Sequence, residues 1–110
     1  MHYKEADATI EPIAIDALPL GLRPNSTYVW NTVEVESGDR IIMYSDGLIE
    51  VEDSDGNIYG SDRFEDAVLK ACRAGDKPRE IIVSVYASVS SFDAASEQVD
   101  DQTMVVVEFE

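Results

Sequence analysis

The fold is decided by the stretch Arg40-Ile41-Ile42-Met43-Tyr44-Ser45-Asp46-Gly47. The run from Ile41 to Tyr44 is continuous and apolar, which is typical of a strand covered on both faces. Gly47 permits a tight backbone turn after this run, and the turn presents the carboxylate of Asp46. The sequence therefore predicts a buried strand over residues 40–44 that ends at an acidic turn.

The residues before this strand predict a hairpin. Residues 28–36 are rich in β-branched and aromatic side chains, and Val33 and Val35 alternate with glutamates. This pattern predicts a half-exposed strand, joined to residues 40–44 by a turn at 37–39. Several prolines in the first quarter of the chain favour extended segments and turns, with residues 18–22 as a buried connector.

The residues after Gly47 predict another short strand or extended segment, because Leu48, Ile49 and Val51 alternate loosely with acidic residues. It ends at the acidic turn 53–57. A calcium-binding EF-hand loop does not fit this turn, because placing Gly56 at the sixth loop position puts Val51 at the first. We expect a solvated hairpin turn.

Two helices should follow. Apolar residues recur every three or four positions from Phe64 to Cys72, with Ser61 as the candidate N-cap and Gly75 as the terminator. A second apolar face of the same period begins near Pro78, followed by a polar loop at 93–99 and a closing buried strand at 104–109. The order predicts an α+β fold, with two consecutive helices packed on a mainly antiparallel sheet.

Composition bounds the class of protein. The 110 residues are 45% hydrophobic, enough for one core, and 23 acidic against 8 basic residues give a net charge of -15. Nucleic acid is therefore a poor partner, and phosphate chemistry here needs bound cations to reverse the local charge.

The single cysteine, Cys72, excludes an intrachain disulfide and is expected to be a buried structural thiol. No apolar run is long enough to cross a membrane, and no signal peptide is evident at the start. We expect a cytoplasmic setting.

Acidic residues stand beside two of the expected strands. Asp46 follows the strand at 40–44, and Asp100 and Asp101 precede the closing strand. If these strands are antiparallel neighbours, the carboxylates converge at one rim of the sheet, where a hard divalent cation such as Mg²⁺ or Mn²⁺ would relieve their repulsion. The alternative is an ordinary Asp-Gly turn and a solvated loop end.

Four segments together carry a family resemblance: Leu20-Gly21-Leu22; Gly38-Asp39-Arg40 through Tyr44-Ser45-Asp46-Gly47 to Glu50; Asn57-Ile58-Tyr59-Gly60-Ser61-Asp62-Arg63-Phe64; and Asp100-Asp101-Gln102-Thr103. In order and spacing they resemble the bacterial RsbU/SpoIIE-type phosphatases of the metal-dependent serine/threonine protein phosphatase (PPM) family. Ser45 stands where those proteins usually have threonine.

The resemblance implies a PPM-type β-sandwich flanked by helices, with two Mg²⁺ or Mn²⁺ ions in a carboxylate cleft. A metal-bridging water would attack phosphoserine or phosphothreonine in a protein substrate, often a STAS-type anti-anti-sigma factor. Asp46 and Asp100 match the family's two C-terminal metal ligands, and Asp101 is a weaker candidate beside them.

One departure leaves enzyme activity open. The family's other ligands, an early strand aspartate and the aspartate of an Asp-x-x-Gly-x-Gly segment, have no counterpart in these residues. We expect residues 1–110 to be a single partial domain, the C-terminal half, inactive alone and with an exposed sheet edge. The alternatives are a non-catalytic regulatory or interaction module that dimerises through that edge, and a plain acidic α+β domain with solvated aspartates.

Overall fold

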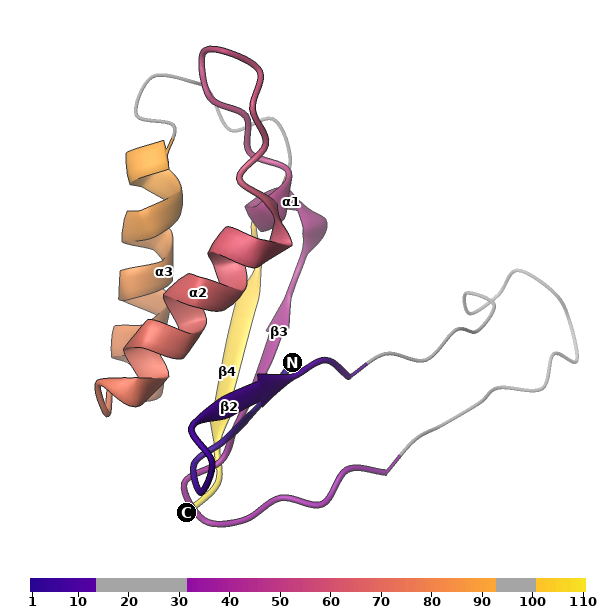
Figure 1. Ribbon diagram of the computed structural model, residues 1–110, viewed down its shortest axis with the longest axis vertical. Coiled ribbons are helices and arrows are strands. Elements are labelled where there is room, and N and C mark those ends of the chain that lie inside the picture. The colour runs from indigo at the N-terminus through magenta and orange to yellow at the C-terminus, as the bar shows by residue number, and fades with distance from the viewer. Residues whose placement is uncertain (14–31, 93–100) are drawn as a thin grey trace, which may run out of the picture.

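The computed structural model describes residues 1–13, 32–92 and 101–110. Their strands form one antiparallel sheet in the order β2-β1-β3-β4 (Figure 1). The bounds are β1 His2–Lys4, β2 Thr9–Glu11, β3 Arg40–Tyr44 and β4 Met104–Glu108. The two longest strands, β3 and β4, lie beside each other, so residues far apart in sequence meet along their length.

The register of β3 and β4 is set by five consecutive pairs, from Arg40 opposite Glu108 to Tyr44 opposite Met104. The strands run antiparallel, so the carboxyl end of β3 meets the amino end of β4. This pairing confirms that the sheet is mainly antiparallel and that the two strands are neighbours.

The described residues also form three helices: α1 Asp46–Ile49, α2 Gly60–Arg73 and α3 Pro78–Phe92. The two long helices lie on one side of the sheet (Figure 1), as the apolar periodicity predicts. Gly75 follows α2 with a φ of 79°, a left-handed conformation that glycine adopts without strain, so it is the terminator as expected. Ser61 is not the N-cap, because the helix begins one residue earlier and Tyr59 occupies that position.

The core lies between these helices and the sheet. Its fully buried side chains include Ile42 of β3, Phe64 and Val68 of α2, and Ile81 and Val85 of α3. Cys72 is 2% exposed and packs in the same cluster, as expected of a structural thiol. Burial raises the pKa of the Cys72 thiol to about 11, so the thiol stays protonated at neutral pH.

The opposite face of the sheet is open in the described part of the chain. Met43, Val105 and Val107 point to this face and are 51%, 43% and 39% exposed. The prediction that residues 40–44 are covered on both faces is therefore wrong for the described residues. The described helices cover one face of the sheet and leave the other open, although the side chains on both faces are apolar.

Two local predictions are also corrected. Residues 32–36 form no strand, and β3 pairs with β1 and β4 in place of the expected hairpin partner; residues 28–31 lie outside the described ranges.

The segment after Ser45, expected to be a strand or extended, begins as one helical turn. The Glu50 amide closes this turn by donating to the Asp46 carbonyl, and the turn buries Leu48 completely. Loose alternation of apolar residues fits either structure.

The acidic turn at 53–57 is confirmed as a hairpin turn. Glu52 and Ile58 pair across it, and the Asp53 carboxylate accepts hydrogen bonds from the backbone amides of Asp55 and Asn57.

The connector expected at 18–22 and the loop expected at 93–99 lie outside the described residues. Among the helices described, none has the length and apolar character needed to span a membrane.

Candidate metal-binding site

Asp46 is the first residue of α1, and Ser45 alone separates it from Tyr44, the last residue of β3. Ser45 keeps an extended backbone, with φ of -93° and ψ of 158°, so the chain turns only at Asp46. Gly47 and Leu48 are buried beneath the turn, whereas the Asp46 side chain is exposed. The local fold therefore presents one carboxylate to solvent at the end of β3.

Residues 101–103 lie against this turn. The Ser45 amide donates to the Thr103 carbonyl over 2.9 Å, and the Thr103 amide donates back to Ser45 Oγ over 2.9 Å. The Ser45 hydroxyl donates to the Asp101 carbonyl over 3.1 Å, and the Gln102 amide group reaches the Gly47 carbonyl over 3.4 Å. The two acidic segments, 55 residues apart, are thus joined at one rim of the sheet.

Helix α3 also contacts this segment, because the Tyr86 hydroxyl donates to the Gln102 carbonyl over 3.2 Å. The sequence predicts that the two strands converge here, but it does not predict the contacts that Ser45, Gln102 and Tyr86 make. A serine next to the acidic turn was the only signal available, and it does not reveal which distant atoms the hydroxyl contacts.

Of the three candidate ligands, Asp46 and Asp101 are described and Asp100 lies outside the described ranges. Both described carboxylates are exposed and belong to residues at the same rim, and carboxylate oxygens are the ligands that Mg²⁺ and Mn²⁺ prefer. The donor chemistry therefore fits a hard divalent cation. Within residues 1–13, 32–92 and 101–110, however, no three His, Cys, Asp or Glu side chains gather as a metal-binding group.

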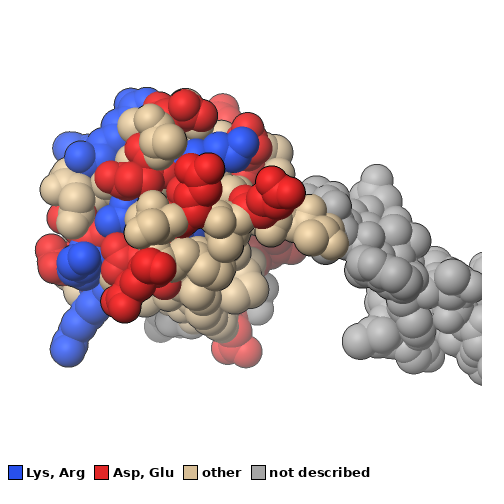
Figure 2. Space-filling view, turned by 90° about the horizontal axis from the view of Figure 1, so that it is seen from below, with Lys and Arg blue, Asp and Glu red and all other residues tan. Residues whose placement is uncertain are grey.

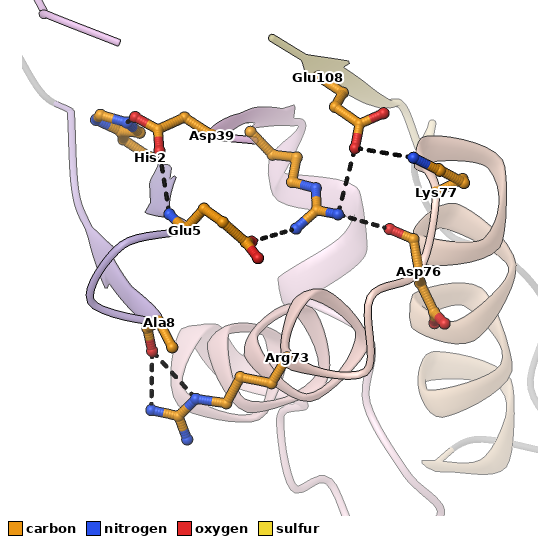
Figure 3. A network of polar contacts seen from close by, with 9 residues as sticks. His2, Glu5, Ala8, Asp39, Arg73, Asp76, Lys77 and Glu108 are labelled. Atoms are coloured by element: carbon orange, nitrogen blue, oxygen red, sulfur yellow. Dashed lines mark hydrogen bonds and ion pairs between the residues drawn. The ribbon is translucent and has the colours of Figure 1, made fainter. Parts of the chain in front are cut away.

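The other end of β3 carries a different set of charges (Figure 3). The buried guanidinium of Arg40 donates to Glu5 over 3.1 Å, to Glu108 over 3.3 Å and to the Asp76 carbonyl over 3.1 Å. Lys77 lies 3.7 Å from the same Glu108 oxygen. Arg40 thus ties the β1–β2 connection to the end of β4 and to the link between α2 and α3.

Asp39, beside Arg40, is buried and accepts hydrogen bonds from three directions. Its carboxylate lies 2.8 Å from His2 Nε2 and accepts from the amides of Glu5 and Glu36, each over 3.0 Å. Burial acts to raise the pKa of Asp39, but the Glu36 amide, the His2 ring and the Glu5 amide outweigh it and hold the pKa below its usual value. The Asp39-Arg40 pair therefore serves the fold, at the end of β3 remote from Asp46.

An antiparallel sheet with two consecutive helices on one face, and acidic loops where β3 ends and β4 begins, is the arrangement of part of a PPM-type phosphatase fold. The chain belongs to the SpoIIE family, because the family model described as Stage II sporulation protein E (SpoIIE) matches residues 1–110. No curated protein and no solved structure gives a significant match. The family membership confirms the resemblance and makes this a phosphatase-related domain.

Proposed function

We propose that this domain is part of an Mg²⁺- or Mn²⁺-dependent phosphoserine/phosphothreonine protein phosphatase, with Asp46 and Asp100 as metal ligands and Asp101 as a weaker one. The observation that carries the proposal is the pairing of Ser45 with Thr103, which joins the Asp46 turn to the segment that begins at Asp101. Two ions, as in the family, would be the full complement.

The charge of the molecule agrees with a cation-dependent reaction. At a net charge of -15 the chain repels a phosphorylated substrate, and bound divalent ions would reverse that sign locally. In such sites the ions lower the pKa of a bound water and neutralise the phosphoryl oxygens. The proposed ligand aspartates would hold and orient the ions, and the exposure of Asp46 and Asp101 leaves room for a phosphoprotein to approach.

The same charge disfavours nucleic acid as a partner. In the view from below, Asp and Glu side chains of the described residues are interspersed with Lys and Arg, without a continuous basic patch on that side (Figure 2). A phosphoprotein is the better substrate class. On family grounds we propose a STAS-type anti-anti-sigma factor, and a cytoplasmic location in a bacterium agrees with that role.

The 110 residues alone should not turn over substrate, because two further ligand aspartates of the family have no counterpart among them. The test is hydrolysis of 4-nitrophenyl phosphate by the purified chain with Mn²⁺, compared with Asp46→Asn as the matched control. We expect both proteins to hydrolyse 4-nitrophenyl phosphate no faster than buffer without protein does. Mn²⁺-dependent turnover that Asp46→Asn abolishes would contradict the inactivity of the chain while supporting the metal site.

A second candidate function is an interaction module that keeps the phosphatase fold and dimerises through a sheet edge. The amide and carbonyl of Ile42 form hydrogen bonds with Met1, so they point toward β1 and away from β4. Backbone groups alternate in direction along an antiparallel strand, and Ile42 lies opposite Val106. The amides and carbonyls that point away from β3 on β4 are therefore those of Met104, Val106 and Glu108. No described strand pairs with that side of β4. An unpaired strand edge of this kind can pair with a strand of a second chain. Light scattering over a range of protein concentrations measures whether the chain dimerises.

A further inference from the structure

We propose that a groove between α2 and α3 is an interface for a second copy of this chain. The groove encloses about 370 Å³ and lies between Arg63, Asp66 and Ala67 of α2 and the C-terminal turn of α3, from Ser88 to Phe92. In Figure 1 the two helices diverge toward these ends. The proposal involves no metal ion and no residue at the Asp46 end of β3, so it does not depend on the proposed phosphatase function.

The two sides of the groove are joined within one chain. The Tyr59 hydroxyl oxygen lies 2.6 Å from Ser88 Oγ, and the edge of the Tyr59 ring packs on Phe92 with the ring centroids 5.5 Å apart. These contacts link the residue before α2 to the end of α3. The groove is therefore formed before a partner arrives, and binding does not have to order it.

Arg63 brings a positive charge to this groove in a fixed position. Its Nη1 donates to the carbonyls of Ile58 and Tyr59, over 2.8 and 3.2 Å, and its guanidinium carbon lies 4.6 Å from the centroid of the Phe92 ring. Within the described residues, Nε and Nη2 of Arg63 have no hydrogen-bond partner. A pre-organised guanidinium with free donors suits a carboxylate of a partner.

Asp66 supplies the matching carboxylate from the same helix. It lies three residues after Arg63, so the two side chains belong to one side of α2, and both are exposed. In the part of the chain that the structure describes, no salt bridge joins them to each other or to a third side chain. The surface of α2 thus carries one unpaired charge of each sign, one helical turn apart.

This pair of charges is complementary to itself. A two-fold axis beside α2, midway between the two residues, sets the helix antiparallel to its copy and places Arg63 against Asp66 of the second copy. The symmetry repeats the contact, so both charges of both copies are paired. Each α2 would then lie in the groove of the other copy, as neighbouring helices do in a four-helix bundle.

The remainder of the groove favours the same occupant. Helix α3 has no charged residue from Ile81 to Phe92, and Ala67 is small enough to let a second helix come close. The chain as a whole has a net charge of -15, so two copies repel over most of their surface. In the groove the charges of Arg63 and Asp66 cancel, which makes it a place where two copies can meet without that repulsion.

The experiment is a charge exchange followed by sedimentation equilibrium over a range of protein concentrations, in EDTA so that metal ions play no part. Arg63→Glu and Asp66→Arg each turn both attractive pairs of the dimer into repulsive ones, and we expect each variant to self-associate about 10-fold more weakly or less. An equimolar mixture of the two variants should associate again, because the carboxylates of one then face the guanidinium groups of the other. The double variant should also recover association.

The matched control is Glu65→Arg, which makes the same change in net charge at an exposed residue whose charge acts on Met1 and Tyr44. It should associate at least as strongly as the unmodified chain. Urea midpoints show whether Arg63→Glu still folds, because Arg63 also bonds to the backbone before α2. If it does not fold, Asp66→Arg, at an exposed residue, decides the question alone against Glu65→Arg.

Three results would overturn the groove interface. The first is a monomer at every concentration of the unmodified chain, and the second is unchanged association in Asp66→Arg. The third is a mixture of folded Arg63→Glu and Asp66→Arg that associates no better than either variant alone. Association that is lost in Val105→Lys and kept in Asp66→Arg would place the contact at the β4 edge instead.

Discussion

At the scale of single residues, the charged side chains at the two ends of β3 differ in burial. Asp39 and Arg40 are buried and bonded on several sides, whereas Asp46 is exposed and lies at the rim that receives residues 101–103. A buried carboxylate with its hydrogen bonds satisfied stabilises the fold. Asp46 has no comparable burial, and this difference separates Asp39, which serves the fold, from Asp46, which we propose as a metal ligand.

The buried pair of Asp39 and His2 predicts an acid-sensitive fold. The pKa of Asp39 is held below the usual 3.8 in the native state, so its stabilisation is fully present above that value and is lost as the pH falls through the lowered pKa. Asp39→Asn should lower the free energy of unfolding at neutral pH, and the difference from the unmodified chain should shrink below pH 3.8. Urea titrations across pH check this expectation.

The matched control for that series is Asp55→Asn, which changes an exposed carboxylate in the 53–57 turn. It should leave stability nearly unchanged at every pH. A constant gap between the unmodified chain and Asp39→Asn down to pH 2 would show that the lost stability comes from packing rather than from the charge of Asp39.

At the scale of elements, local pattern was enough for β3, α2, α3 and β4. The two strands have continuous apolar runs, the two helices have apolar residues every three or four positions, and boundary residues such as Gly75 after α2 and Pro78 at the start of α3 mark the helix ends. The helical turn α1 could not be predicted, because what decides it is the burial of Leu48 under tertiary contacts. The β1 partner of β3 was missed for a related reason, since strand pairing across the chain depends on long-range packing.

Phe64 is a core position through which α2 packs on β3. Phe64 is fully buried, and its ring centroid lies 4.2 Å from that of Tyr44, the last residue of β3. Phe64→Ala should destabilise the domain by about 3–5 kcal/mol through lost burial and the cavity left behind. Val83→Ala, at an exposed site on α3, should change stability by about 0.5 kcal/mol or less.

These two free energies of unfolding come from urea denaturation followed by circular dichroism. Similar values for Phe64→Ala and Val83→Ala would contradict a core that lies between α2 and β3. An unfolded Phe64→Ala chain would agree with the large expected cost, and Phe64→Leu would then supply a measurable intermediate.

At the scale of the whole molecule, the sheet is covered on one face and open on the other, among the residues described. The convergence of the acidic loops followed from antiparallel strand order alone, and the structure confirms it through Ser45 and Thr103. The hydrogen bonds of the Ser45 hydroxyl group to Thr103 and Asp101 could not be predicted, because they depend on side-chain geometry between residues far apart in the sequence, 58 residues in the case of Thr103. The candidate ligand Asp100 lies outside the described residues, so its assignment remains a prediction from resemblance.

The open face and the free side of β4 together predict self-association that responds to salt. Val105 and Val107 lie on the open face of β4, and a second copy paired along this strand would place its own valines beside them. The net charge of -15 opposes that contact, so association should strengthen as salt screens the repulsion. Light scattering at low and high salt measures the effect.

The matched variant is Val105→Lys, which replaces an apolar side chain in the contact of such a dimer by a charged one. Because salt does not restore the lost apolar contact, the variant should associate more weakly at high salt, and its urea midpoint should stay nearly unchanged because the side chain is exposed. A monomer at every salt and protein concentration, for the unmodified chain as well, would rule out the interaction module that uses this edge.

The most direct test of the proposed metal site at the Asp46 end of β3 is paramagnetic broadening by Mn²⁺ in the amide NMR spectrum of the ¹⁵N-labelled chain. We predict that sub-stoichiometric Mn²⁺ selectively broadens the amides of Asp46, Gly47, Asp101 and Gln102, and that Asp46→Asn removes the effect. The acidic turn at 53–57 is an internal control for non-specific binding. Equal broadening of that turn and the rim, or no broadening at the rim, would contradict a metal site built on Asp46.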